Sequence, residues 1–286
     1  MKRSSRCRER PLSRHERRHL LPEAGWYRGG NAFVPEGAKA FSLVGERMLP
    51  RPFWQRLYTT DEQEAEQAAQ RLAALARAHG AQRVLDGHAG VGHRAVALAA
   101  AGLDVTAAEA DEWRFATAAR LVRATHAPVT LYRLGMTRLA NIEGAPFDMA
   151  LLLDDALALV GQPAAARLLD TMHRVVRPGG LLVVGLRDWE QHLRRRETFI
   201  PRQVARVNGS RLFMFEAWEY TDKRMAHCSH FYVSFGASKW HVEVREMLYE
   251  AIFRDEAEQA FAAAGWRILE EITLDDRRWW VLRSTP

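Results

Sequence analysis

The chain has 286 residues, of which 48% are hydrophobic and 27% are charged, and it contains only two cysteines. This composition is typical of a soluble globular protein that is long enough for one full α/β domain and an added lobe. Two cysteines exclude a disulfide framework and a cysteine-based metal site. Such low cysteine content is expected of a protein in the reducing cytoplasm. No stretch approaches the roughly 18 uninterrupted apolar residues of a membrane helix, so we expect no membrane partner.

The positive charge of the chain is confined to its first residues. Residues 1–19 hold eight Lys and Arg and two Glu, which accounts for the whole formal charge of +6. A polar, arginine-rich segment with few apolar residues is predicted to be disordered. Because the rest of the chain is neutral overall, we do not expect a nucleic-acid partner.

Residues 20–59 combine aromatic side chains with Gly and Pro and are predicted to form a loop-like arm. Such a segment must pack against something larger, either as filling in a groove of the main domain or as a lid over a substrate. A helix is predicted from about residue 61 to residue 79. Thr60 and Gln63 have the spacing of a capping box, and Gly80 ends the apolar stripe.

The segment from residue 83 to residue 111 has the pattern of a strand, a glycine-bearing turn, a helix and a second strand. Gly90 and Gly92 allow a tight turn and a close approach of the backbone to a ligand. The first N–H groups of the helix at 93–101 offer a site for an anion or a polar ligand edge. Glu109 follows the second strand, where an acidic side chain can accept hydrogen bonds from both hydroxyls of a ribose. The alternative is an ordinary connection with a solvated Glu109.

Strands and helices continue to alternate up to about residue 190 and again after residue 254. Helices are predicted at 112–126, 163–176 and 255–264, and strands at 128–134, 147–153, 181–186, 267–273 and 278–283. This order predicts an α/β fold with a Rossmann-like, doubly wound, mostly parallel seven-stranded sheet. Residues 203–250 instead show strand alternation with hairpin turns such as Asn208-Gly209, so they predict an antiparallel β insertion between the fifth and sixth strands.

Three motifs resemble those of the class I S-adenosylmethionine-dependent methyltransferases. They are VLDGHAGVG at 84–92, FDMALLL followed by DDALALV at 147–160, and HRVVRPGGLLVVGLRDWE at 173–190. The run RPGG between helix and strand is the most specific of them. Within the class, the last motif and the antiparallel insertion resemble the small-molecule N-methyltransferases typified by glycine N-methyltransferase. The resemblance implies methyl transfer from S-adenosylmethionine to a small metabolite, at nitrogen.

The predicted organisation therefore has four parts. They are a disordered tail at 1–19, an arm or lid at 20–59, a methyltransferase domain at 60–190 together with 250–286, and a substrate-cap insertion at 191–249. The resemblance covers roughly residues 60–190 and 250–285.

The resemblance also implies cofactor-binding residues. They are Asp86, Gly87, His88, Gly90, Gly92, Glu109, Met136 and Asp154. In such enzymes the glycine loop surrounds the methionine part of the cofactor and the acidic residue binds the ribose, while the other two segments line the adenine and the methyl group. The chain departs from the family pattern at His88, which replaces the first glycine of the loop, and at Gly135, which replaces an acidic residue.

Methyl transfer from a sulfonium is a direct displacement, so the protein mainly supplies alignment. The predicted catalytic residues are Asp155, His88 and Tyr220, and the predicted substrate-binding residues are Arg187, Trp189, His230 and Tyr232. Arg187 falls where such enzymes bind a substrate carboxylate, for which a bidentate donor is suited. The alternatives are a strand-end salt bridge for Arg187, a helix cap for Asp155 and core packing for His230 and the tyrosines. The scattered histidines predict no metal site.

Two other functions remain open at this point. One is an RNA or protein methyltransferase that uses the basic tail to find its target, and the other is a family member that binds the cofactor without methylating. The oligomeric state is also open, with a homodimer as one alternative.

Overall fold

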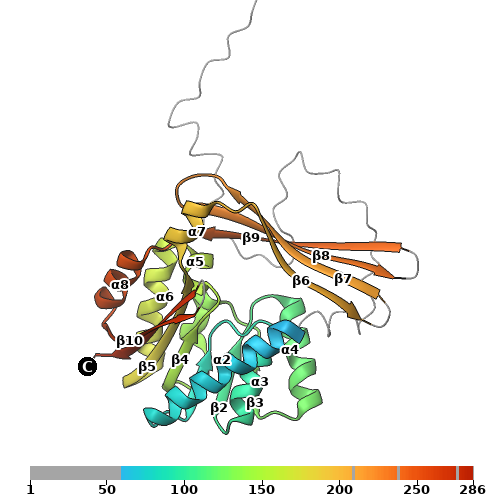
Figure 1. The fold of residues 1–286 in the computed structure, drawn as a ribbon. Coiled ribbons are helices and arrows are strands. Elements are labelled where there is room, and N and C mark those ends of the chain that lie inside the picture. Colours follow the sequence, from blue (N-terminus) through green and yellow to red (C-terminus); the bar gives the residue numbers. More distant parts are fainter. Residues whose placement is uncertain (1–58, 208–209, 237–238, 275–276, 286) are drawn as a thin grey trace, which may run out of the picture. The chain divides into compact units, whose positions relative to one another are not determined.

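Seven strands, most of them separated by helices, form one sheet in the computed structural model (Figure 1). The structure describes residues 59–285 except 208–209, 237–238 and 275–276. The strands are β1 (Arg83–Asp86), β2 (Asp104–Ala108), β3 (Val129–Tyr132), β4 (Phe147–Leu152), β5 (Val176–Arg187), β10 (Trp266–Leu274) and β11 (Arg277–Ser284). Their order in the sheet is β10-β11-β5-β4-β1-β2-β3. The first five are parallel, while β11 runs antiparallel to β5 and β10 antiparallel to β11. The predicted Rossmann-like fold is confirmed.

The helices cover both faces of this sheet. They are α2 (Thr59–Ala78), α3 (His93–Ala100), α4 (Glu112–Thr125), the 3-10 helix η3 (Met136–Asn141), α5 (Ala156–Val160), α6 (Gln162–Val175), α7 (Trp189–Arg195) and α8 (Arg254–Ala263). Of these, α5, η3 and α7 were not predicted. No described helix has both the length and the apolar character that a membrane crossing requires. The predicted tail at 1–19 and all but the last residue of the arm at 20–59 lie outside the described residues.

Strand β4 shows why its sequence is an almost continuous apolar run. Met149 and Leu151 pack with α2 and α3 in one core, whereas Ala150 and Leu152 pack with α6 and α8 in the other. All four side chains are fully buried. A central strand with helices on both faces has no solvent side, so it needs apolar residues at every position.

The predicted insertion forms a second, four-stranded antiparallel sheet, whose long strands follow one another in Figure 1. Its strands are β6 (Phe199–Val207), β7 (Ser210–Tyr220), β8 (Met225–Gly236) and β9 (Lys239–Glu250), in that spatial order. One face of this sheet carries buried side chains such as Trp218, Cys228 and Tyr249, which belong to the same core as α6 and α8. The insertion therefore shares a core with the seven-stranded sheet.

The RPGG run does more than end a helix. Phe147 pairs with Val176 and Met149 pairs with Leu181, so β5 bulges outward between its two paired segments. Arg177 Nε donates to Asp148 Oδ1 at 2.6 Å. A Cβ at Gly180 would lie 2.6 Å from Val176 Cγ1 and 2.8 Å from the Asp148 carbonyl oxygen. Only glycine fits where the bulge folds back against β4.

We expect Gly180→Ala to lower the free energy of unfolding by about 1–3 kcal/mol, because the added methyl group overlaps backbone and a buried side chain. Chemical denaturation measures this change. Gly135→Ala is the control, since its Cβ would meet only the Ala110 Cβ, at 3.7 Å. Equal stability of the two variants would show that the bulge relaxes without cost.

Candidate functional site

The glycine loop and the predicted ribose-binding acid lie together at the carboxyl ends of β1 and β2. Gly90 N–H donates to Glu109 Oε2 at 2.9 Å, and Asp111 N–H donates to Glu109 Oε1 at 2.8 Å. The Glu109 side chain is buried, and both of its oxygens keep lone pairs for further donors. A Cβ at Gly90 would meet no atom within 4 Å, so there is open space beside the backbone here. This arrangement fits a ligand that presents hydroxyl groups to Glu109 and passes close to the loop.

The guanidinium of Arg94 fixes the shape of this loop. Its Nε and Nη2 donate to the two oxygens of Asp86 at 2.9 and 3.0 Å, and Nη2 also donates to the His88 carbonyl at 2.8 Å. Nη1 donates to Asp154 Oδ2 at 2.8 Å. Asp86 is fully buried and Arg94 nearly so. The network joins the end of β1, the loop, the start of α3 and the end of β4.

Asp154 and Asp155 follow β4 and both adopt left-handed backbone conformations, with φ of 58° and 60°. About half of the Asp154 side chain is exposed. Its partial burial would by itself raise the carboxyl pKa, but the charges of Arg94 and Arg277 outweigh this effect and hold that pKa well below its usual value. Arg277 Nη1 lies 3.1 Å from Asp154 Oδ1. Asp154, a predicted cofactor residue, therefore stays ionised near the glycine loop.

Asp155 points to a different partner. Its Oδ1 accepts from Arg187 N–H at 2.8 Å and its Oδ2 from Arg187 Nε at 2.9 Å. Both side chains are buried, and the carboxylate of Asp155 outweighs the effect of burial and raises the pKa of Arg187. The guanidinium carbon of Arg187 also lies 5.1, 4.7 and 5.5 Å from the ring centres of Trp189, Trp218 and Tyr249. Asp155, Arg187 and Trp189 thus form one buried cluster, and their predicted chemical roles stay predictions.

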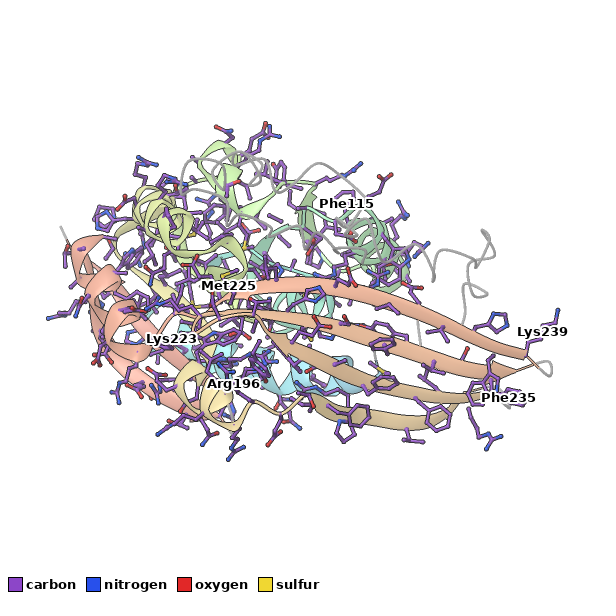
Figure 2. The ribbon with its side chains drawn as sticks, turned by 90° about the horizontal axis from the view of Figure 1, so that it is seen from above. Phe115, Arg196, Lys223, Met225, Phe235 and Lys239 are labelled. Carbon is purple, nitrogen blue, oxygen red and sulfur yellow. The ribbon has the colours of Figure 1, made fainter. Side chains whose placement is uncertain are left out.

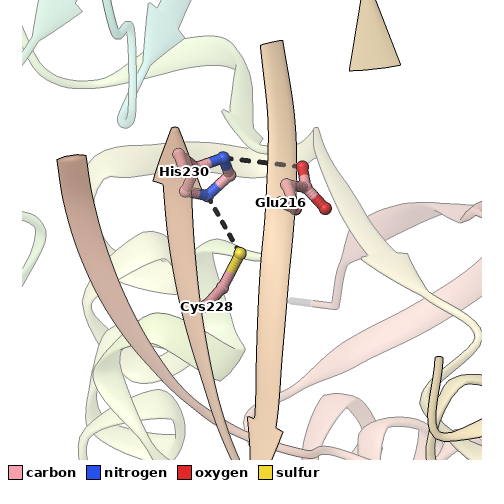
Figure 3. A group of neighbouring side chains, drawn as sticks. All are labelled: Glu216, Cys228 and His230. Carbon is pink, nitrogen blue, oxygen red and sulfur yellow. Dashed lines mark hydrogen bonds and ion pairs between the residues drawn. The ribbon is translucent and has the colours of Figure 1, made fainter. Parts of the chain in front are cut away.

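The inner face of the four-stranded sheet continues this cluster. Figure 3 shows His230 between Glu216 and Cys228, with Nδ1 lying 3.5 Å from Glu216 Oε1 and Nε2 lying 3.4 Å from Cys228 Sγ. Burial lowers the pKa of His230 to about 4, so the imidazole is neutral near neutral pH. Burial also raises the pKa of the Cys228 thiol, which therefore stays protonated. The cluster presents a neutral imidazole beside a carboxylate.

The same three side chains are grouped closely enough to be considered as metal ligands, since their donor atoms lie within 4.8 Å of one another. However, each nitrogen of His230 faces a different partner, so the three donors do not converge on one point. Arg202 also donates to both oxygens of Glu216, at 2.7 and 2.8 Å, and its charge opposes a cation there. The prediction that the chain has no metal site stays a prediction.

The remaining predicted residues lie around the glycine loop and the aromatic cluster. Tyr220 donates from its hydroxyl to the Glu197 carbonyl at 3.0 Å, and burial raises its pKa to about 12. Tyr232 is half-buried on the same face of β8 as His230, two residues further along the strand. Met136 begins η3 and packs against the core beside α6. Gly87 and Gly92 allow close packing, since a Cβ at Gly92 would lie 2.9 Å from Ala118 Cβ.

Sequence reasoning missed Arg94, Glu216 and Tyr249. Arg94 had a visible signal, because it is the one Lys, Arg, Asp or Glu in the helix HRAVALAA that follows the glycine loop. Glu216 and Tyr249 had none. Each is one polar or aromatic residue in an alternating strand, and the register that brings them to the inner face comes only from the structure.

Residues 84–180 match the family model described as "Methyltransferase domain". This match covers about a third of the chain, and it supports the predicted S-adenosylmethionine-dependent methyltransferase activity and its cofactor. No curated protein matches the chain by sequence.

Several solved structures share the fold along most of the chain. An S-adenosylmethionine-dependent methyltransferase from Clostridium acetobutylicum is 11% identical, with a TM-score of 0.69 over 82% of this chain and 98% of its own. CalS10, an amino pentose methyltransferase from Micromonospora echinaspora, is 19% identical, with a TM-score of 0.66 over 84% and 99%. The sugar N-methyltransferase KedS8 from a Streptoalloteichus species is 18% identical, with a TM-score of 0.66 over 90% and 100%. At these identities the similarity shows the fold alone.

We expect the stability of the protein to fall in acid partly because Asp154 becomes protonated. Its folded-state pKa is lower than its unfolded value, so its contribution is present above the unfolded pKa and is lost as the pH falls through the folded one. Asp154→Asn removes this titration, and Asn tolerates the left-handed backbone. Urea denaturation between pH 5 and pH 2 should give a shallower loss of stability for this variant.

Asp170→Asn, at an exposed position on α6, is the matched control and should keep the wild-type pH dependence. Identical pH profiles for the wild type and Asp154→Asn would contradict the role of Asp154 in the ion-pair network.

Proposed function

We propose that this methyltransferase transfers the methyl group of S-adenosylmethionine to an amine nitrogen of a small molecule. The observation that carries this proposal is the neutral, half-buried His230 beside the Glu216 carboxylate on the inner face of the four-stranded sheet. An ammonium ion must lose a proton before its nitrogen can attack a methyl group. The imidazole of His230 can accept that proton at Nε2, which then exchanges its 3.4 Å contact with the weakly bonding Cys228 thiol for the substrate. Glu216 stabilises the imidazolium that results.

The cofactor supplies the electrophilic methyl group, and this chain supplies its binding site. We assign Glu109 to the ribose hydroxyls and the loop from Gly87 to Gly92 to the methionine part. Asp86 and Asp154 shape this site through Arg94, and His88 lies within it, with Nδ1 at 3.4 Å from the Leu153 carbonyl. Met136 belongs to the adenine side.

The acceptor side is assigned to residues of β8 and of the aromatic cluster. His230 and Tyr232 contact the substrate directly, whereas Asp155 and Arg187, whose charges pair with each other, hold the end of β4 against the insertion. Trp189 packs against this ion pair. Tyr220 contacts the aromatic cluster through Trp218, with the two ring centres 6.4 Å apart. These roles favour a small substrate, because few of the polar groups involved are exposed to a large partner.

Known relatives support nitrogen as the acceptor. KedS8 is described as a sugar N-methyltransferase and MtfA as a glycopeptide N-methyltransferase, while CalS10 is described as an amino pentose methyltransferase. The sequence resemblance to glycine N-methyltransferases favours the same atom. We propose a cytoplasmic enzyme of small-molecule biosynthesis, with no nucleic-acid or membrane partner.

Glu109→Ala should weaken binding of S-adenosylmethionine by about 10- to 100-fold, because it removes the acceptor of two hydroxyl hydrogen bonds. Isothermal titration calorimetry measures this change. Glu112→Ala is the control, since Glu112 lies close by in sequence but is exposed and pairs with exposed Arg133. Unchanged affinity in Glu109→Ala would refute the assigned cofactor site.

His230→Gln should reduce turnover by about 100-fold or more while the cofactor affinity stays unchanged, because glutamine keeps the polarity but accepts no proton. Production of S-adenosylhomocysteine with a panel of amino sugars, amino acids and a glycopeptide provides the assay. His126→Asn, at the exposed end of α4, is the control. Methylation of hydroxyl acceptors only, or full activity of His230→Gln, would overturn the proposal.

A further inference from the structure

The four-stranded sheet has a second apolar face, on the side away from the site. Side chains alternate along a strand, so the residues between Glu216, Trp218, Cys228 and His230 point outward. The described part of the chain has seven exposed large hydrophobic residues. Six of them lie on this outer face: Phe199, Val204, Trp240, Val242, Val244 and Leu248. An antiparallel sheet with one solvent face normally carries polar residues there.

Aromatic rings join these residues into one surface. Phe215 stacks on Phe231 with ring centres 4.8 Å apart, and Phe199 lies 5.1 Å from Phe215. Trp240 lies 4.9 Å from Phe235. The cross-strand register places Phe215, Phe231 and Val244 in one row across the middle of the sheet. The outer face is therefore a continuous apolar surface, and such a surface marks an interaction site.

We propose that this outer face binds the same face of a second copy of the chain, so that two sheets stack around a two-fold axis. Four strands about 4.8 Å apart and about ten residues long present about 650 Å² per copy, so the pair buries about 1,300 Å². This area is sufficient for a specific dimer. The two stacked sheets form a sandwich with an apolar centre.

Charge complementarity fixes the direction of the axis. Arg211 and Glu219 are exposed on the outer face of β7, four residues before and four residues after Phe215. In Figure 2, Phe235 lies near one end of β8 and Met225 lies at the other end. In the strand register, Arg211 is opposite Phe235, and Glu219 is opposite His227, which is close to the Met225 end. A two-fold axis that crosses the strands at Phe215 brings Arg211 of one copy over Glu219 of its partner.

The same axis places Val244 of one copy near Val244 of the other, and Trp240 over Leu248. An anionic lipid surface is a poorer occupant, because exposed Glu219 and Glu246 lie on this face. Arg211 and Glu219 are about 27 Å apart along one strand, so they pair only between copies.

Sedimentation velocity of the full chain at micromolar concentrations tests the proposal. The wild type should sediment with twice the 32.6 kDa mass of the chain. Val244→Lys should raise the dimer dissociation constant by about 100-fold or more, because two lysines meet at the axis without partners. Ile268→Lys is the control, since Ile268 is an exposed aliphatic residue on β10, and it should remain dimeric.

A charge exchange tests the axis without altering the apolar centre. Arg211→Glu alone should weaken the dimer, and the double variant Arg211→Glu with Glu219→Arg should restore it, because the two sites meet only between copies. This measurement also decides the case if Val244→Lys does not fold. A monomeric wild type, a dimer that Val244→Lys leaves intact, or a charge exchange without recovery would overturn the proposal.

Discussion

The ion pairs of one buried arginine hold the proposed cofactor site together. Arg94 donates to Asp86, to the backbone of the glycine loop and to Asp154, so two strand ends and one helix share a single guanidinium. A buried cation is tolerated only where carboxylates and carbonyls satisfy its donors, and this geometry leaves the loop little freedom. The position of His88 and the orientation of Gly90 toward Glu109 both depend on it.

A second buried arginine, Arg187, has the corresponding role at the proposed acceptor site. Arg187 joins Asp155 at the end of β4 to aromatic rings from β7 and β9, so the seven-stranded sheet and the insertion meet at one charge. Because Asp154 and Asp155 are adjacent and each pairs with a different arginine, their left-handed backbone links the two ends of the site. A shift of this dipeptide would move both ion pairs, and with them the proposed cofactor and acceptor sites, together.

The fold could be predicted from the sequence because its signals are local. Apolar runs such as FDMALLL, the glycine turn and RPGG each specify an element from a few neighbouring residues, and their order determines the sheet. The ion-pair partners could not be predicted in this way. Asp86 and Arg94 are close in sequence, but Asp154, Arg187 and Glu216 find their partners through strand order and register. For the same reason the carboxylate-binding role of Arg187 came from family resemblance, whereas its pairing with Asp155 required coordinates.

Because Cys228 is buried, its reaction with an alkylating reagent reports local opening of the protein. Its thiol is fully inaccessible in the shared core and is held in the unreactive protonated form. An alkylating reagent can reach it only when β7 and β8 separate from the rest of the core, so the rate of labelling at Cys228 measures how often the inner face of the four-stranded sheet opens. Ligands that close the site should slow this reaction, whether or not they are turned over.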